Sequence, residues 1–358
     1  MKKFYLVLII LLMSISSNTS AQDNGVMSLA SSFIDTVKSN SYTGLLVNWD
    51  SITPIFMEKS KKVKEVKDLL PLFKSVLELL HDEHSSVEYH EIDTSMTESF
   101  MVQVHQMAGT TDAEAGLPPK NFQSYMIDKK YAYINVPPVQ FEQVKYIDTI
   151  RQQLEALDAK NPKAWIIDLT ENSGGANYPM IWHFASLIDV DYSYSQVFND
   201  GEETKISVVL QPIGKEAEQV YDILGLSPSK HPPVKLKNNN IPIVILASYY
   251  TASAAEAFLL HFKGQKNVTI IGQKTAGRTS SNQYYEIGKY FSLELTVSLL
   301  KERNGGIYQI NEGVTPDVII PFDMSNIKTT NQLLEAIVKN KPVYLEKAVE
   351  ILEKRGGF

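Results

Sequence analysis

The stretch IPIVILASYYTASAAEAFLLHF (241–262) decides how the rest of the chain is interpreted. Its first half is a continuous apolar run, which is typical of a buried strand. Its second half places apolar residues at helical spacing. Ser253 lies where the strand would turn into the helix. The stretch therefore predicts a strand–turn–helix unit with a serine at the turn.

The same alternation continues on both sides of this stretch. Further strands are expected in YAYINVPPV (131–139), AWIIDLTENSGG (164–175), VTIIGQKTAG (268–277) and DVIIPF (317–322). Amphipathic helices are expected between them, in EQVKYIDTIRQQLEAL and PMIWHFASLID. Strands that alternate with helices predict an α/β core whose sheet is largely parallel. One exception is YFSLELTVSLLKERNGGIYQ (290–309), which we expect to form a hairpin that turns at the Asn-Gly-Gly sequence.

The remaining segments divide the chain into further regions. Residues 22–88 contain two stretches with helical periodicity and predict a small helical cap. Residues 89–130 are mixed in character and predict connecting strands and a loop rich in Gly, Pro, Thr and Asp. The α/β core is expected to occupy residues 131–325, and residues 326–358 predict a closing helical tail.

The first residues have the layout of a secretory signal peptide. A basic start (MKK) precedes about ten apolar residues and a run of small residues that ends at Ala21. The apolar part is too short to span a bilayer, so we expect residues 1–21 to be removed and the mature protein to be exported to the periplasm or the medium. The alternative is an uncleaved membrane anchor. No later segment predicts a transmembrane helix.

Composition excludes several classes of protein. The formal net charge of −7 argues against nucleic acid as the main partner, because phosphate binding needs a basic surface. The chain has no Cys, which excludes both a disulfide framework and a lipid-bearing cysteine. At 44% hydrophobic content, the 358 residues are enough for a substantial core stabilised by packing alone.

Ser253 has two interpretations on local sequence. With Glu256 it fits a capping box, in which the two residues satisfy each other's backbone N–H groups at the start of a helix. The same position would also expose the hydroxyl as a nucleophile at the carboxyl edge of the sheet, with the N–H of Ala254 free to stabilise an oxyanion. The Gly-x-Ser-x-Gly sequence of α/β-hydrolases is missing, which disfavours that fold.

A nucleophilic serine needs a base, and LLHDEHSSVEYH (79–90) offers His84. His81, Glu83 and His90 lie close by and raise a metal site as an alternative, but the spacing differs from that of the His-Glu-x-x-His motif. Surface residues at a helix end explain the same segment more simply. We therefore expect neither a metal nor an organic cofactor.

Taken in order, six segments carry a resemblance to a known family. They are LLHDEHSSV, YAYINVPPV, WIIDLTENSGG, VILASYYTASAAEAF, IIGQKTAGRTS and NEGVTPDVIIPF. Together they resemble the serine peptidases that include the carboxyl-terminal processing (tail-specific) proteases, the tricorn core and the interphotoreceptor retinoid-binding protein. The resemblance covers residues 78–322 and implies a ClpP/crotonase-like α/β fold.

The resemblance assigns roles to individual residues. Ser253 corresponds to the nucleophile, and the oxyanion hole is implied to use the N–H groups of Ala254 and of Gly174 or Gly175. The lysine base of the tail-specific branch falls on Arg278, which cannot accept a proton. Lys274, four residues earlier, matches a lysine without a catalytic role.

The tricorn-like branch fits better, because it uses a histidine and a glutamate. These correspond to His84 as base and Glu312 as the carboxylate that supports it. The branch also has a serine directly before the histidine, whereas Glu83 stands there in this chain; Ser85 is a possible substitute. The segment between His90 and Tyr131 is too short for the peptide-binding PDZ module that many members carry.

The resulting prediction is a secreted, PDZ-free serine endopeptidase that acts on a peptide or protein substrate. The alternative is a non-catalytic binding protein on the same fold, since a fold does not determine a function. Tyr178, Trp182, Tyr249 and Tyr250 lie near the expected site and would suit a hydrophobic or carbohydrate ligand. Core packing would also account for these aromatic residues.

Overall fold

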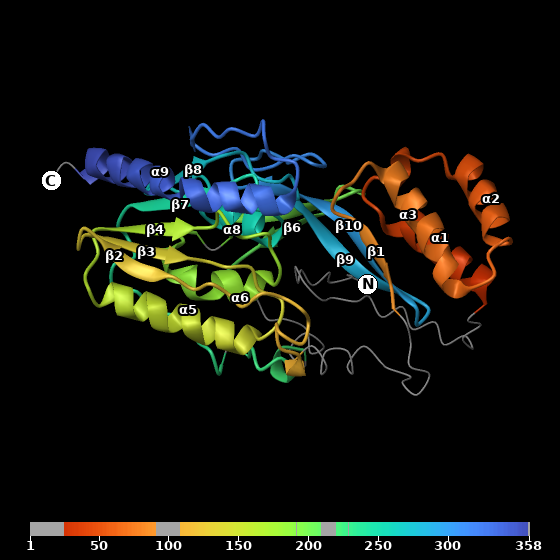
Figure 1. Ribbon diagram of the computed structural model, residues 1–358, viewed down its shortest axis with the longest axis horizontal. Helices are drawn as coiled ribbons and strands as arrows, with labels where there is room; N and C mark the ends of the chain where they lie inside the picture. The colour runs from red at the N-terminus through yellow and green to blue at the C-terminus, as the bar shows by residue number, and fades with distance from the viewer. Residues whose placement is uncertain (1–24, 91–107, 191, 209–219, 228, 357–358) are drawn as a thin grey trace.

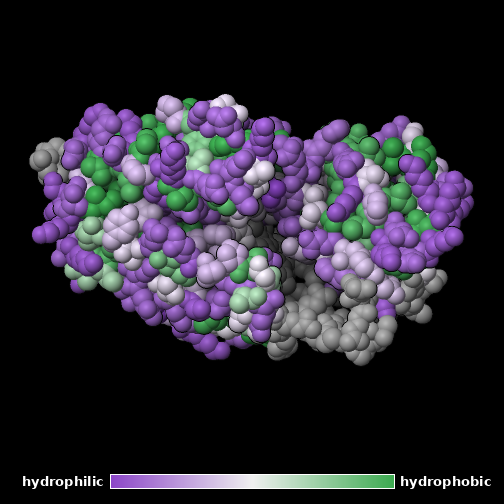
Figure 2. Space-filling model, in the orientation of Figure 1, coloured by the Kyte–Doolittle hydropathy of each residue, from purple (hydrophilic) through white to green (hydrophobic). Residues whose placement is uncertain are grey.

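The computed structural model describes residues 25–90, 108–190, 192–208, 220–227 and 229–356. Within them the chain forms a large α/β core and a smaller helical cap, joined by a long β-ribbon (Figure 1). The two lobes are separated by an indentation in the molecular surface (Figure 2). The predicted signal peptide lies outside the described residues.

The core is built on a six-stranded sheet that confirms the predicted α/β class. Its strand order is β11 (Val318–Ile319), β8 (Val268–Gly272), β7 (Ile243–Ala247), β4 (Ala164–Asp168), β3 (Tyr131–Asn135) and β2 (Ser124–Ile127). All neighbours are parallel except β2, which runs antiparallel to β3 at the edge. The four central strands are apolar nearly throughout because both faces of this sheet are covered.

Alternate side chains of each strand enter different layers. Trp165, Ile167 and Ile245 pack on one face with α5 (Gln143–Asp158), α6 (Asn177–Ile181), the 3-10 helix η4 (Trp182–Leu187) and α8 (Ala254–Phe262). Ile166 and Leu246 pack on the other face, against Tyr344 and Ala348 of α9 (Thr330–Gly356). The predicted helical tail is therefore the second layer of the core (Figure 1).

The cap has its own apolar interior. It consists of α1 (Val26–Asn40), η1 (Gly44–Leu46), α2 (Trp49–Ser60), η2 (Val66–Leu69), α3 (Leu70–Leu77) and η3 (Glu78–Leu80). The rings of Phe33 and Phe73 stack at its centre with centroids 3.9 Å apart. Phe291, Leu293 and Leu295 of the ribbon belong to the same buried cluster, so the ribbon forms the floor of the cap.

A second, five-stranded sheet connects the lobes, and the sequence did not predict it. Its strands are β1 (Ser86–Tyr89), β5 (Tyr194–Phe198), β6 (Glu203–Ile206), β9 (Ser280–Ile287) and β10 (Phe291–Glu302). The expected hairpin was only partly right. β10 pairs with β9 through the turn at 288–290, whereas after the Asn-Gly-Gly turn the pairing is limited to a short bridge at Lys301 and Ile307, with backbone hydrogen bonds on either side of it.

β10 crosses from one lobe to the other. Its first half lies in the cap cluster, while Leu300 lies in the core cluster. Its register with β9 shifts between Thr296 and Ser298, where the strand passes the junction of the two lobes. In the part of the chain that the structure describes, no helix combines the length and the apolarity that a bilayer crossing requires.

Candidate active site

The loops that follow β4, β7 and β8 meet at the carboxyl edge of the parallel sheet. Ser253 lies in the loop after β7, at the start of α8, as the sequence predicted. Two hydroxyls hold this loop against the loop after β4: Thr251 Oγ1 donates to the Leu169 carbonyl (2.8 Å) and Ser248 Oγ to the Thr170 carbonyl (2.6 Å). The position of Ser253 is therefore fixed by two neighbouring strands.

The backbone of Ser253 is strained. Its φ of 53° and ψ of −119° lie in a region that residues with a Cβ rarely adopt. Such strain is characteristic of nucleophile turns between a strand and a helix. The turn is built here without the glycines of the Gly-x-Ser-x-Gly sequence, because Gly174 of the adjacent loop leaves the space. A Cβ at Gly174 would lie 2.9 Å from the Cβ of Ser253.

Glu256 has a larger role than the capping box implied. Its fully buried carboxylate accepts the Ser253 N–H (2.8 Å), as expected for that motif. It also accepts the N–H groups of Gly277 (3.0 Å) and Arg278 (2.8 Å) and the hydroxyl of Thr275. One carboxylate thus ties the serine turn to the loop after β8.

The structure brings His84 to Ser253. His84 Nε2 lies 3.1 Å from Ser253 Oγ, although the two residues are 169 positions apart. His84 lies between η3 and β1, on the cap side of the junction, whereas Ser253 belongs to the core. The pair therefore spans the boundary between the lobes. Hydrogen-bond distance between a serine hydroxyl and an imidazole is the geometry that a nucleophile and its base require.

The other ring nitrogen of His84 contacts a residue that the sequence did not single out. His84 Nδ1 lies 2.7 Å from Ser280 Oγ, at the start of β9. Ser280 Oγ lies in turn 3.4 Å from Thr296 Oγ1 on β10. The sequence signal for Ser280 is its position at the end of the IIGQKTAGRTS segment, two residues beyond Arg278.

Two amide side chains hold the backbone of the His84 loop. Asn311 accepts the Glu83 N–H (3.1 Å) through Oδ1 and donates to the His81 carbonyl (2.9 Å) through Nδ2. Asn282 Nδ2 donates to the carbonyl of His84 itself (2.8 Å). The base is therefore placed by the core and the ribbon as well as by the cap.

The surroundings of His84 favour its neutral form. Burial lowers the pKa of His84 to about 4, and the positive charge of Arg278 acts in the same direction. The negative charge of Asp82 opposes this effect, although its carboxylate accepts the His84 backbone N–H (2.9 Å) and not a ring N–H. At neutral pH the imidazole can therefore accept a proton.

The structure distinguishes between the two candidate oxyanion glycines. The N–H of Gly174 donates to Asn172 Oδ1 (2.8 Å), so it is already used. Gly175 is exposed, and neither its N–H nor that of Ala254 has an acceptor among the described residues. Gly175 has a φ of 111°, and a Cβ there would lie 2.0 Å from the Val139 carbonyl oxygen, so only glycine fits.

Two expected partners of His84 lie elsewhere. The carboxylate of Glu312 accepts the Gln309 N–H (2.8 Å), and Ser280 occupies the position at His84 Nδ1 that was expected for it. Ser85 donates its hydroxyl to Asp82 (2.5 Å) and accepts the Thr296 N–H (2.9 Å). The structure thus brings neither Glu312 nor Ser85 to the ring of His84.

The neighbours that suggested a metal site are also dispersed. His90 Nε2 contacts Ser292 Oγ (2.8 Å) on β10. Across the ranges that the structure describes, no three His, Cys, Asp or Glu residues are grouped as metal ligands.

The aromatic residues near the site serve mainly to pack the core. Tyr178 packs between Trp182 and Tyr221, with ring centroids 4.8 and 5.0 Å away. Trp182 is buried and donates its indole N–H to the His231 carbonyl (2.5 Å). Tyr249, which is more exposed, lies edge-on to Phe322. Tyr250 is half-buried, so among the described residues Tyr178 and Trp182 pack into the interior whereas Tyr249 and Tyr250 stay partly accessible.

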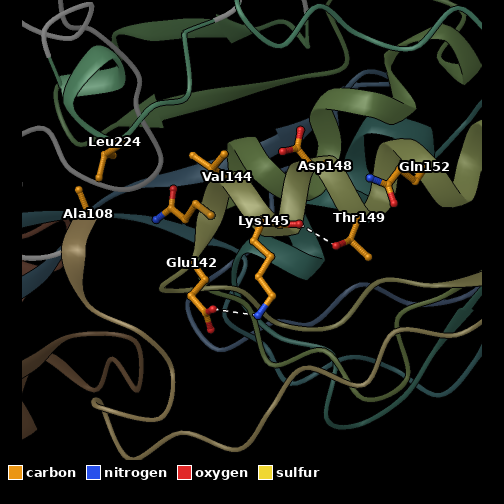
Figure 3. A pocket seen from close by; sticks show the side chains of 9 residues that line it. Ala108, Glu142, Val144, Lys145, Asp148, Thr149, Gln152 and Leu224 are labelled. Carbon is orange, nitrogen blue, oxygen red and sulfur yellow. Dashed lines mark hydrogen bonds and ion pairs between the residues drawn. The ribbon is translucent and has the colours of Figure 1, made fainter.

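A separate hollow of about 490 Å³ lies at the start of α5 (Figure 3). Charged and polar side chains dominate its lining, including Glu142, Lys145 and Asp148. Neither Ser253 nor His84 lines it. The loop that precedes α5 follows β3, so the hollow lies at the same carboxyl edge of the sheet as the Ser253–His84 pair.

Part of the chain matches a known protein family. The model of peptidase family S41 matches residues 130–320, which is just over half of the chain. A nisin-resistance protein from Lactococcus lactis subsp. lactis is 22% identical over 263 residues, covering 73% of each chain.

Solved structures share the fold at low sequence identity. A lipoprotein from Streptococcus agalactiae superposes with a TM-score of 0.65 at 19% identity, over 94% of this chain and 99% of the other. Mature CPAF gives a TM-score of 0.53 at 13% identity, over 93% and 99%. The tricorn protease gives 0.52 at 13% identity, over 94% of this chain but 37% of its own. Because the family match covers more than half of the chain and the fold agrees with it, the chain belongs to peptidase family S41 and is a serine peptidase.

Proposed function

We propose that the protein is an exported serine endopeptidase in which Ser253 is the nucleophile and His84 the base. The observation that carries this proposal is the 3.1 Å distance between Ser253 Oγ and His84 Nε2. It joins two segments far apart in the sequence, on two different lobes, at the carboxyl edge where ligands of parallel sheets bind. The strained backbone of Ser253 supports the same role.

The proposed reaction follows from these positions. Ser253 Oγ attacks the carbonyl carbon of a peptide bond while its proton passes to His84 Nε2. The tetrahedral intermediate then expels the amine, which takes that proton from His84 and leaves an ester on Ser253. Water, deprotonated by His84, hydrolyses the ester and restores the hydroxyl. No metal or organic cofactor is required for any of these steps.

Ser280 takes the orienting role in this proposal. When His84 carries its proton on Nδ1, that N–H donates to Ser280 Oγ and leaves Nε2 as the acceptor for Ser253. A hydroxyl fixes the tautomer as a carboxylate would, but it supplies no negative charge. The low pKa of His84 is consistent with this uncharged partner.

We assign the oxyanion hole to the N–H groups of Ala254 and Gly175. Ala254 is the first residue of α8, so the positive end of the helix dipole reinforces its N–H. Gly174 supports the hole indirectly, since its own N–H is bonded to Asn172. The sequence left open whether Gly174 or Gly175 donates to the oxyanion, and we propose Gly175.

Export and the substrate are parts of the same proposal. Export is supported by the basic, apolar and small-residue layout of residues 1–21 and by similarity to a protein described as a lipoprotein. Family membership supports a peptide or protein substrate. Similarity to a nisin-resistance protein makes nisin a reasonable member of a substrate panel. The alternative of a purely binding function is less favoured, because two of the four aromatic residues that suggested it, Tyr178 and Trp182, pack on each other.

Covalent labelling tests the proposal. The protein without residues 1–21 is incubated with a fluorophosphonate, and its intact mass is measured beside Ser253→Ala and His84→Ala. We expect one adduct on the parent protein, none on Ser253→Ala, and labelling slowed at least about a hundredfold in His84→Ala. An adduct that forms equally fast in His84→Ala would contradict the assigned base. No adduct at any pH from 5 to 9 would contradict the nucleophile.

A further inference from the structure

The family resemblance placed Arg278 where related peptidases have a catalytic lysine, and the proposed reaction gives it no function. Arg278 is exposed. Its backbone N–H is bonded to Glu256, yet across the residues that the structure describes its guanidinium has no hydrogen-bond or ion-pair partner. An arginine beside a catalytic pair without a protein partner is available to a ligand.

The backbone fixes the direction of this side chain. Glu256 anchors the N–H groups of Gly277 and Arg278 beside the N–H of Ser253. Thr279 is buried, with its hydroxyl on the Glu312 carbonyl, and Ser280 contacts His84. Burial alternates here, with Arg278 exposed, Thr279 buried and Ser280 partly exposed, which places Arg278 and Ser280 on the same side of the segment that leads into β9.

The electrostatic effects agree with this placement. Burial lowers the pKa of His84 and raises that of Glu294, and the positive charge of Arg278 adds to the first effect and opposes the second, so Arg278 lies near both side chains. Three acids from the surrounding elements have other partners: Asp82 binds Ser85 and a backbone N–H, Glu312 binds the Gln309 N–H, and Glu294 interacts with Asn282 and Tyr284. None of the three forms an ion pair with the guanidinium.

We propose that Arg278 binds a carboxylate of the substrate next to the scissile bond. This deepens the proposed function and rests on it. A guanidinium has the planar, two-pronged donor geometry that matches a carboxylate. Two sources share this chemistry: the free carboxyl terminus of a peptide that is cut near its end, and an Asp or Glu side chain close to the cleavage point. Replacement of the lysine by arginine thus exchanges a base for a substrate-recognition group.

Binding to the inactive protein tests the proposal without requiring turnover. Ser253→Ala is immobilised and offered three pools of hexapeptides, and the retained peptides are measured by mass spectrometry. The first pool has free carboxyl termini and no acidic side chains. The second has the same sequences as carboxamides. The third consists of carboxamides with one Glu at varied positions. Each pool is also offered to Ser253→Ala carrying either Arg278→Gln or Lys274→Gln.

Lys274→Gln is the matched control, because it removes one exposed positive charge four residues away. We expect Ser253→Ala to retain carboxylate peptides about tenfold more than their carboxamides. Arg278→Gln should abolish this preference, and Lys274→Gln should preserve it. Retention of the first pool identifies the terminal carboxylate as the source, and retention of the third identifies a side chain.

Two results would overturn the proposal. One is equal retention of carboxylate and carboxamide pools by Ser253→Ala. The other is a preference that persists in Arg278→Gln or disappears equally in Lys274→Gln. A failure of the proposed function would look different: the protein with Ser253 intact would form no fluorophosphonate adduct, whatever the pools show. Thermal unfolding of each variant confirms that the binding comparison is made on folded protein.

Discussion

The Nδ1 atom of His84 lies 2.7 Å from the hydroxyl of Ser280, at the position where a Ser-His-acid triad has its carboxylate. A hydroxyl can accept the Nδ1–H and orient the ring, but it cannot neutralise the imidazolium that forms during the reaction. The proposed base is therefore a weakly basic histidine whose orientation is set by a neutral residue.

Replacement of Ser280 by alanine should slow the labelling of Ser253 by about tenfold to a hundredfold, because the ring of His84 loses its orienting partner. The measurement is the second-order rate constant for fluorophosphonate labelling. Ser280→Thr, which retains the hydroxyl, should recover part of the rate. Ser281→Ala is the control, since Ser281 bonds to Gln196 instead of His84. Equal rates for Ser280→Ala and Ser281→Ala would refute the orienting role.

Replacement of Glu312 by glutamine should change the labelling rate less than about threefold. Its carboxylate accepts a backbone N–H from Gln309, and an amide oxygen can do the same. A small effect would support the contact seen in the structure, with Gln309, over the contact with His84 that the family resemblance implied. A loss as large as that of Ser280→Ala would mean that Glu312 reaches His84 during the reaction.

Glu256→Ala should destabilise the protein by about 3 kcal/mol or more and abolish labelling. The substitution leaves the N–H groups of Ser253, Gly277 and Arg278 and the hydroxyl of Thr275 without their shared acceptor. Urea unfolding measures the change in free energy. Glu155→Ala, on the exposed side of α5, is the control and should stay within about 0.5 kcal/mol. A similar value for both variants would show that Glu256 does not organise the turn.

The rate of labelling should be nearly independent of pH from 8 down to about 5 and should fall only as the pH approaches 4. Burial lowers the pKa of His84 to about 4, so its neutral, proton-accepting form persists throughout the higher range. A pH series with the stable fluorophosphonate adduct as readout measures this limb. An acid limb centred near pH 6.5 would show that His84 titrates like an exposed histidine.

The protein should lose stability as the pH falls from about 6.5 toward 4. Burial lowers the pKa of His84 and His183 to about 4 and that of His261 to about 3, all below the value of about 6.5 in an unfolded chain. In this window the unfolded state binds more protons than the folded state, so the free energy of unfolding decreases with decreasing pH. Urea unfolding at pH 7 and pH 5 tests the sign. His183→Phe should reduce the slope, and a stability that rises toward pH 5 would refute the account.

The sequence was sufficient to predict the core because its strands are buried on both faces. The apolar runs that form β4, β7 and β8 predict a parallel sheet even when each is considered alone. The turns after β4 and β7 contain Gly174, Gly175 and Ser253. The second sheet could not be predicted in this way. β9 is largely polar and half-buried, and β10 finds β5 about a hundred residues away, so only the folded chain decides their pairing.

The same distinction separates the site residues that were predicted from those that were missed. Ser253 and His84 lie in segments that resemble a family motif, whereas Ser280 contacts His84 only through the placement of β9. Glu312, in contrast, was predicted to contact His84 but lies elsewhere. Its residue type matched the family, but its direction depends on the loop geometry at Asn311, whose φ is 60° and whose side chain holds the His84 loop.

The passage of β10 through both lobes has a consequence for when the enzyme can become active. His84 is synthesised 169 residues before Ser253 and 196 residues before Ser280, and the ribbon strands β9 and β10 that hold it also come late in the chain. A nascent chain shorter than 253 residues contains only His84 of the pair that we propose for catalysis. Activity by the proposed mechanism therefore requires that synthesis and folding have passed β9 and β10, so the pair cannot form early in translation.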